Sequence, residues 1–228
     1  MLLREVEYAK PASVAEALGM LRANDGARAL AGGQTLINVM KARAASPDLL
    51  VDLNALDDLK AIELGPDGTL TIGGNVCSND PTNHLPPLMC AVGAQMTIAS
   101  EDGERTVTAQ EFFVGVYLTA VGPGELLTRL TIPAGKQDGY AAITLGADGT
   151  CIANAAASLN GSLRVALGCV DAVPIVVQPA STDEAAVREA VRGVGLTPPS
   201  DVHASSEYRI HLAEVLAVRA ARQAAGRS

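Results

Sequence analysis

The sequence predicts an α+β protein built from two domains. Residues 5–53 alternate strand-like and helix-like segments, and residues 61–132 contain strand-like runs that can pair as hairpins. Three further strand-like runs follow each other between residues 140 and 170, separated by turn residues. Mixed helices and strands followed by an antiparallel meander are typical of the α+β class. We therefore expect a first domain over residues 1–134 and a second over residues 135–228, which combines a three-stranded antiparallel sheet with helices.

Composition narrows the kind of protein this can be. The chain has 228 residues, of which 48% are hydrophobic and 18% charged, as in a folded domain with a sizeable core. It has no Trp and only two Phe, so the core must consist mainly of aliphatic side chains. A net charge of −8 argues against a nucleic-acid partner. We find no apolar run of membrane-spanning length and no secretory signal in MLLREVEYAK, and so expect a cytoplasmic protein without a membrane span.

The first segment predicts strands around one capped helix. We expect strands at Glu5–Tyr8, Ala27–Leu30 and Leu49–Leu53 because each is a short run of strand-forming residues bounded by Pro, Gly or Asn. Ser13 and Glu16 form the Ser-x-x-Glu pattern of a capping box and predict a helix that begins there.

The middle segment predicts two hairpins, a short helix and a closing strand. Asp-Gly pairs at two of the turns favour tight connections between antiparallel strands. The expected elements are a hairpin of Ala61–Leu64 with Leu70–Ile72, a helix at Pro86–Val92, a hairpin of Gln95–Ala99 with Arg105–Thr108, a turn at Glu111–Phe113 and a strand at Leu126–Ile132.

The C-terminal segment predicts the second domain. Asp-Gly and Asn-Gly turns separate its three strands, and hydrophobic residues at helical spacing follow them. The expected elements are strands at Tyr140–Leu145, Cys151–Leu159 and Leu163–Val170, a helix at Ser181–Val191 capped by Ser181 or Thr182, and a helix at Ser205–Ala224 capped by Ser205 or Ser206.

The residues that usually carry catalysis or bind metals form no motif. No two cysteines have CxxC spacing, and no histidine lies near a cysteine at the spacing of a zinc site. Nucleophile and metalloprotease motifs are also absent from the sequence. We expect no metal site and no catalytic residue on this chain, small buried thiols, and a cofactor as the source of any chemistry. The cysteines are Cys77, Cys90, Cys151 and Cys169, and the histidines are His84, His203 and His211.

Two glycine pairs follow strands and stand out as candidate ligand loops. Ala31–Leu36 reads AGGQTL, and Thr71–Asn75 reads TIGGN. Glycine lets a ligand approach the main chain, and successive N–H groups in such turns can bind anions. The same pairs also occur in ordinary turns, and the spacing differs from the GxGxxG pattern, so the residues alone leave both interpretations open. The side chains that could add hydrogen bonds are Gln34, Thr35, Asn75 and Ser78.

Four stretches together resemble one family. They are YAKPASVAEALGMLRANDGARALAGGQTL, TIGGNVCSNDPTNHLPPLMCAVGAQMTI, EFFVGVYLTAVGPGELLTRLTIP and SSEYRIHLAEVLAVRAARQA. In this order they are similar to the FAD-binding medium subunit of the molybdenum hydroxylases, of the xanthine dehydrogenase and carbon monoxide dehydrogenase type. The resemblance implies that the first domain is a two-part FAD-binding domain.

The resemblance also implies which residues bind FAD. The two glycine loops would wrap the diphosphate and adenosine, with Gln34 and Thr35 on phosphate oxygens. Asp80 or His84 would contact the ribityl chain or the flavin ring, and Val121 would lie against the isoalloxazine. His84 could instead be a surface residue at a helix start, and Asp80 a turn residue. The implied cofactor-binding set is Leu30, Ala31, Gly32, Gly33, Gln34, Thr35, Leu36, Thr71, Gly73, Gly74, Asn75, Asp80, His84 and Val121.

The function implied by the resemblance is electron transfer within an oxidoreductase. A large partner subunit would hold the molybdenum cofactor, and a small partner subunit would hold [2Fe-2S] clusters. This chain would bind FAD and pass electrons from those clusters to an external acceptor. The implied assembly is a dimer of heterotrimers.

The sequence departs from the family pattern at two places. A helical segment that usually precedes the second glycine loop is missing, because LGPDGTLTIGGN joins two strands directly. Thr144 and Ile152 stand near positions where members carry a basic and an aromatic residue. These departures support an alternative, a scaffold subunit of the same complex that has lost FAD binding. A free-standing nucleotide-binding module is a third interpretation.

Overall fold

The computed structural model describes residues 3–33, 35–74, 80, 82–135, 137–146 and 149–226. The chain forms two compact units that interleave along the sequence. The first comprises residues 1–78, 95–107 and 120–131, and the second comprises residues 79–94, 108–119 and 132–228. The second unit thus includes two short segments from the middle of the chain. The domain division between residues 134 and 135 stays a prediction.

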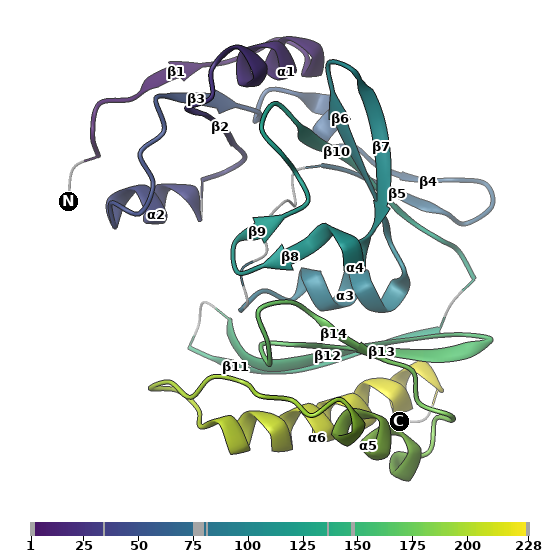
Figure 1. The fold of residues 1–228 in the computed structure, drawn as a ribbon. Helices are drawn as coiled ribbons and strands as arrows, with labels where there is room; N and C mark the ends of the chain where they lie inside the picture. Colours follow the sequence, from purple (N-terminus) through teal and green to yellow (C-terminus); the bar gives the residue numbers. More distant parts are fainter. Residues whose placement is uncertain are drawn as a thin grey trace. The chain divides into compact units, whose positions relative to one another are not determined.

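The first unit begins with a small parallel sheet. Its strands β1 (Glu7–Ala9), β2 (Ala27–Leu30) and β3 (Leu49–Asp52) lie in the order β1-β3-β2 (Figure 1). The helix α1 (Val14–Ala23) packs on β2 and β3, and α2 (Leu36–Lys41) connects them. The predicted β2 bounds are confirmed, and the other two strands shift by one or two residues.

The start of α1 confirms the capping interpretation in part. Ser13 Oγ accepts a hydrogen bond from the Glu16 N–H at 3.1 Å. The Glu16 carboxylate accepts from the Ala12 N–H at 2.7 Å instead of from the N–H of Ser13. Both bonds satisfy main-chain donors at the helix start and fix its first turn.

A second, five-stranded sheet completes the first unit. The predicted hairpins and the closing strand are confirmed, and the strand order is β4-β5-β10-β6-β7. A short 3-10 helix precedes this sheet. The bounds are η1 Asp57–Leu59, β4 Ile62–Leu64, β5 Leu70–Gly73, β6 Gln95–Ser100, β7 Gly103–Thr108 and β10 Leu126–Ile132.

The hairpin of β4 and β5 has one apolar face. Ile62 pairs with Ile72 and Leu64 pairs with Leu70, so all four side chains point to the same side. Strand β4 is an edge of the sheet, and Ile62 and Leu64 are 71% and 74% exposed. Nothing in the described part of the chain covers these two side chains.

The second unit is layered around a four-stranded antiparallel sheet, β11-β12-β13-β14. Helix α3 packs on one face of β12 and β13, and helices α5 and α6 cover the other face (Figure 1). The three predicted strands and both C-terminal helices are confirmed. The bounds are α3 Leu85–Val92, β11 Gln137–Leu145, β12 Thr150–Asn160, β13 Ser162–Gly168, β14 Ile175–Val177, α5 Glu184–Gly193 and α6 Ser206–Ala224.

The structure corrects the sequence interpretation at three places. Strand β14 adds a fourth strand to the C-terminal sheet. The segment expected as a turn is the helix α4 (Ala109–Phe112), because Thr108 and Glu111 form a complete capping box. The short ribbon of β8 (Phe113–Gly115) and β9 (Leu118–Thr119) follows it.

The N-caps of the last two helices differ in how well the sequence predicts them. Helix α5 begins at Glu184, three residues after the predicted start at Ser181, with Asp183 as its N-cap. Ser181 Oγ bonds the Asp183 N–H and carboxylate, and so stabilises the turn before the helix. Ser205 is the N-cap of α6, as predicted, and accepts from the Tyr208 N–H at 3.2 Å.

Small residues let α6 approach the sheet closely. The core of the second unit contains fully buried alanines of β12 and α6 together with Val165, Leu167 and Leu216. Gly139 on β11 faces the helix, and a Cβ atom there would lie 2.1 Å from the Ala220 carbonyl oxygen. Main chain therefore packs against main chain at this contact, which any larger residue would prevent.

The second glycine pair serves the same purpose in the first unit. A Cβ atom on Gly73 would lie 2.3 Å from the carbonyl carbon of Leu59, and one on Gly74 would lie 1.7 Å from the carbonyl oxygen of Leu127. Both glycines are buried. Packing of β5 against η1 and β10 therefore explains why glycine is needed at both positions.

We predict that Gly74→Ala destabilises the chain by about 3 kcal/mol, because the added methyl group must displace the main chain of β10. Gly193→Ala is the matched control, since nothing lies within 4 Å of its Cβ position, and should stay within about 1 kcal/mol of the wild type. Urea unfolding followed by circular dichroism measures both. Equal stability of the two variants would contradict the packing explanation.

Candidate flavin-binding site

The first glycine loop leaves the parallel sheet at its carboxyl edge. Leu30, the last residue of β2, lies opposite Asp52, the last residue of β3. The Leu53 N–H donates to the Leu30 carbonyl at 3.0 Å and closes the sheet at this point. Ligands of α/β sheets bind beyond the carboxyl ends of parallel strands, so the loop has the position of a binding loop.

The main chain of this loop is open on one side. Gly32 and Gly33 have φ angles of 71° and 76°, a left-handed conformation that favours glycine. Gly33 is buried, and its missing side chain leaves room for Ile37, whose Cγ1 would lie 2.9 Å from a Cβ atom. Gly32 is exposed, and no atom of the described residues lies within 4 Å of its Cβ position. Gly32 therefore presents bare main chain to a ligand.

Sequence reasoning missed a polar cluster beside this loop. Tyr8 Oη donates to one oxygen of Asp52, and the other oxygen accepts from the Asn54 N–H and Nδ2 at 2.9 and 2.7 Å. The Tyr8 bond holds the pKa of Asp52 below its usual range, against the opposing effect of burial. The signal in the sequence that could have revealed this cluster is Asp52, a carboxylate at the end of a buried strand. The cluster fixes the carboxyl end of β3 next to the loop.

The second glycine loop is only partly described. The Gly73 N–H donates to the Ala61 carbonyl at 2.8 Å and is used within the fold. Thr71 is half-buried on β5. The predicted contacts at Asn75 and Ser78, and the predicted phosphate contact at Gln34 of the first loop, lie outside the described residues.

Asp80 and His84 belong to the second unit and already have protein partners. Asp80 Oδ1 accepts from the Thr82 N–H at 2.9 Å and from its hydroxyl at 2.8 Å, which is a turn of the kind considered above. His84 Nε2 lies 3.1 Å from the Gly149 carbonyl and must donate to it, while Nδ1 bonds the hydroxyl of Tyr140. Both ring nitrogens of His84 are therefore engaged within the second unit.

Val121 lies in a loop that an ion pair fixes. Arg105 donates to Glu125 at 3.1 and 2.7 Å and to the Ala120 carbonyl at 2.6 Å. The Gly122 N–H donates to Glu125 Oε2 at 2.7 Å. The hydrogen bond from Arg105 holds the pKa of Glu125 below its usual range. The half-buried Val121 is thus positioned by bonds to both of its neighbours.

The two positions where the sequence departs from the family pattern differ in exposure. Thr144 is exposed on β11, whereas Ile152 is buried in the core of the second unit. Of the predicted set, Ala31 is exposed, and Thr35 and Leu36 are half-buried at the start of α2. The described residues contain no group of three or more metal-ligating side chains. None of the helices in the described ranges has the length and apolar character that crossing a bilayer requires.

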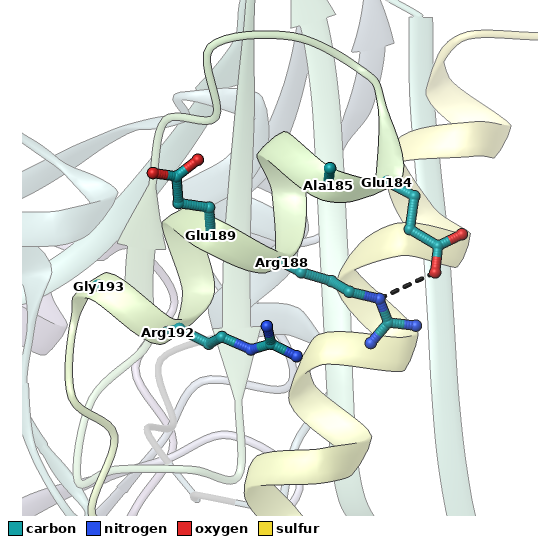
Figure 2. A pocket seen from close by; sticks show the side chains of 6 residues that line it. All are labelled: Glu184, Ala185, Arg188, Glu189, Arg192 and Gly193. Carbon is teal, nitrogen blue, oxygen red and sulfur yellow. Dashed lines mark hydrogen bonds and ion pairs between the residues drawn. The ribbon is translucent and has the colours of Figure 1, made fainter.

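Residues of α5 line a hollow of about 810 Å³, and none of them belongs to the predicted cofactor-binding set. Figure 2 shows Arg188 and Arg192 among the side chains that line it. Glu214 of α6 accepts from both arginines, at 3.2 Å from Arg188 and at 2.9 and 2.8 Å from Arg192, and Glu184 pairs with Arg188 at 2.9 Å. These charges neutralise each other and join α5 to α6.

The first loop fits FAD better than the described part of the second. Bare main chain at Gly32 leaves space that a Cβ atom would otherwise occupy, beside a carboxyl edge with fixed geometry. The described glycines of the second loop face their own fold. The residues present therefore fit a nucleotide cofactor at the first loop.

Comparison with known proteins identifies this domain. The family described as the FAD binding domain in molybdopterin dehydrogenase matches residues 4–70 and 68–135. The matched region contains both glycine loops and the loop of Val121. Residues 4–135 therefore belong to the family of FAD-binding domains of the molybdopterin dehydrogenases.

Relatives extend the likeness over the whole chain. The carbon monoxide dehydrogenase medium chain of Afipia carboxidovorans is 30% identical, over 100% of this chain and 99% of its own length. The glyceraldehyde dehydrogenase medium chain of Sulfolobus acidocaldarius is 28% identical, over 97% and 99%. The solved structure of reconstituted CO dehydrogenase from Oligotropha carboxidovorans matches with a TM-score of 0.90 and 27% identity, over 100% of both chains. This chain belongs to the FAD-binding medium subunits of the molybdenum hydroxylase family, which are subunits of oxidoreductases.

The comparisons also bear on the missing segment. The alignment with the Afipia relative runs over 290 positions, although this chain has only 228 residues. The two matches to the family meet at residues 68–70, within the β4–β5 hairpin. The longer alignment indicates that the relative has residues that this chain lacks, and the divided family match supports a missing segment at this hairpin, directly before the second glycine loop.

We predict that the Glu214 network loses its stabilising effect in acid. The hydrogen bond from Arg192 lowers the pKa of Glu214 in the folded chain, opposed by burial and aided by Arg188. A lowered folded pKa means that the contribution is present above the unfolded pKa of about 4.3 and is lost as the pH falls through the folded value. Glu214→Gln should therefore lower the free energy of unfolding of the chain at about pH 7. The difference in this free energy between the variant and the wild type should shrink below about pH 4.

Urea unfolding across this pH range measures the difference. Glu189→Gln on the neighbouring helix α5 is the control, because Glu189 is exposed and lines the hollow without an ion pair among the described residues. A difference between Glu214→Gln and the wild type that stays constant with pH would contradict the assignment.

Proposed function

We propose that this chain is the electron-transfer subunit of a molybdenum-containing hydroxylase or dehydrogenase, receiving electrons from iron–sulfur clusters of a small partner and delivering them to an external acceptor. A large partner holds the molybdenum cofactor and carries out the reaction on substrate, and the complex is a cytoplasmic dimer of heterotrimers. The open main chain at Gly32, at the carboxyl edge of the parallel sheet, is the observation that carries the proposal.

The residues of this chain bind and orient FAD and take no part as acid or base. Ala31–Leu36 and the loop that begins at Thr71 together wrap the diphosphate and adenosine, and Gln34 and Thr35 donate hydrogen bonds to phosphate oxygens. Asp80 or His84 contacts the ribityl chain or ring, and Val121 lies against the isoalloxazine. When bound, FAD supplies a centre that accepts and releases electrons singly or in pairs. The protein supplies position and polarity.

The bonds around Val121 and Asp52 support this role. Arg105 and Glu125 restrict the conformation of the loop of Val121 through bonds to its residues. The Asp52 cluster fixes the end of β3, which lies opposite Leu30 at the start of the first loop. Loops fixed in advance lose less conformational entropy on binding, which favours affinity.

The scaffold interpretation has a specific observation in its favour. The glycines of the second loop pack inside the fold, and the adjoining segment is missing. A medium subunit that kept its partner surfaces but lost FAD would show both features. The two functions differ in one measurable property, the flavin content.

We predict a stoichiometric flavin signal in the visible absorption of the purified chain and of its denatured supernatant. Gly32→Ala should lose most of the flavin, because its Cβ atom enters the open space beside the loop, while stability falls by only about 1 kcal/mol from the left-handed backbone. Gly193→Ala should keep both flavin and stability. A folded wild-type chain that co-purifies with its partners and carries no flavin would overturn the proposal and leave the scaffold interpretation.

Electron transfer needs a separate test in the assembled complex. When the iron–sulfur clusters are reduced, their change in absorption should be followed by bleaching of the flavin absorption. An added electron acceptor should reverse both changes. Clusters that are reduced and reoxidised without any change in the flavin band would contradict an electron-transfer role, even if the flavin is bound.

A further inference from the structure

Two thiols of the second unit contact the same side-chain amide. Cys151 is on β12, and Cys169 directly follows β13, its antiparallel neighbour. The Asn154 amide nitrogen lies 3.3 Å from Cys151 Sγ and 3.6 Å from Cys169 Sγ. One side-chain amide therefore bridges both sulfur atoms, and all three residues are buried.

Packing fixes the bridging amide. Asn154 is fully buried and lies over Gly168, where a Cβ atom would come within 2.3 Å of Asn154 Oδ1. Its nitrogen also lies 3.3 Å from the Asn83 carbonyl. Among the described residues Asn154 Oδ1 has no hydrogen-bond partner, so the donor end of the amide makes all of its polar contacts. A buried polar atom without a hydrogen-bond partner costs free energy of folding. The arrangement therefore points to a role of the Asn154 amide at the sulfur atoms.

One guanidinium holds both chain segments that carry the thiols. Arg209 of α6 donates from Nη1 to the carbonyl of Ile152, the residue after Cys151, and to the carbonyl of Cys169 at 3.4 Å. Its Nη2 pairs with Asp201 at 2.6 Å. Cys169 has a φ angle of 65°, which is unusual for a residue with a side chain. The surrounding bonds thus keep Cys169 in a strained conformation, with its thiol at the same amide that Cys151 contacts.

The surroundings of the pair shift the pKa values of the two thiols in opposite directions. A hydrogen bond from the Cys169 thiol lowers the pKa of Cys151 to about 7, with further help from Asn154 and His84. The same hydrogen bond and burial raise the pKa of Cys169. The Cys151 thiol also donates to the carbonyl of Ala153 at 3.3 Å and to that of Ile143 at 3.6 Å. Cys90 of the same unit shows the contrast, because burial raises the pKa of its thiol to about 12.

We propose that Cys151 and Cys169 form a reversible thiol–disulfide modification site that reacts with hydroperoxides. The Cys151 sulfur attacks one peroxide oxygen, the O–O bond breaks, and the other oxygen leaves as hydroxide and becomes water. Cys169 then attacks the sulfenic sulfur of Cys151, the S–O bond breaks, and the proton of Cys169 leaves with the hydroxyl as a second water. Two thiols are oxidised to one disulfide, and one hydrogen peroxide is reduced to two waters. An added dithiol reverses the step.

The test uses the full chain in a Cys77→Ser background, because Cys77 lies outside the described residues. The protein is treated with hydrogen peroxide in small excess, denatured and alkylated, and its mass is measured before and after reduction with dithiothreitol. Trypsin cuts after Arg164, between the two cysteines, so a disulfide joins two otherwise separate peptides. We expect that joined pair, a mass loss of two hydrogens, and full recovery of both thiols on reduction.

Three variants separate this site from general thiol oxidation. Cys151→Ser and Cys169→Ser should abolish the joined peptides, and Cys90→Ser should leave their yield and rate unchanged. The background protein alone keeps the test decisive if a variant fails to fold. Recovery of both thiols unmodified after peroxide, or oxygen addition to Cys151 without a link to Cys169, would overturn the proposal. Neither outcome depends on whether the chain binds flavin.

Discussion

Close approach of main chain to main chain is the constraint on which both units depend. In the first unit, β5 runs directly against η1 and β10 because Gly73 and Gly74 have no side chains. In the second unit, Gly139 and the alanines of β12 let α6 lie close to the sheet. A chain with no Trp and only two Phe cannot fill wide gaps, so its layers must approach closely. The positions of glycine and alanine in the sequence therefore set the distance between the packed layers.

The same constraint changes the meaning of a Gly-Gly motif. The two glycine pairs read almost alike in sequence, since each follows a strand and precedes a polar side chain. In the structure, Gly32 presents open main chain, whereas Gly73 and Gly74 contact their own fold. Local sequence does not distinguish these cases, because the difference lies in the neighbours brought by strands distant in the sequence. A glycine motif therefore becomes a binding site only through its tertiary surroundings.

Much of the fold was predictable because local signals were consistent with the tertiary structure. Strands β2 and β10 have the predicted bounds, and the caps Ser13 and Ser205 begin α1 and α6 as expected. The one-turn helix α4 and strand β14 were missed, since α4 shows only in its capping pair and β14 has three residues. The site was less predictable. The family resemblance identified the loops, but the Asp52 cluster and the partners of His84 depend on contacts across many residues.

The uncovered edge strand β4 has a consequence for how the chain behaves in solution. Its main-chain groups face outward at the end of a five-stranded sheet, and Ile62 and Leu64 add apolar area beside them. Such an edge is a template on which another extended chain can add a strand. The rate at which two chains associate in this way is second order in protein concentration. It therefore rises with the expression level even when the folding stability of the chain does not change. Strand β4 is therefore an edge in the described part of the chain at which such association can begin.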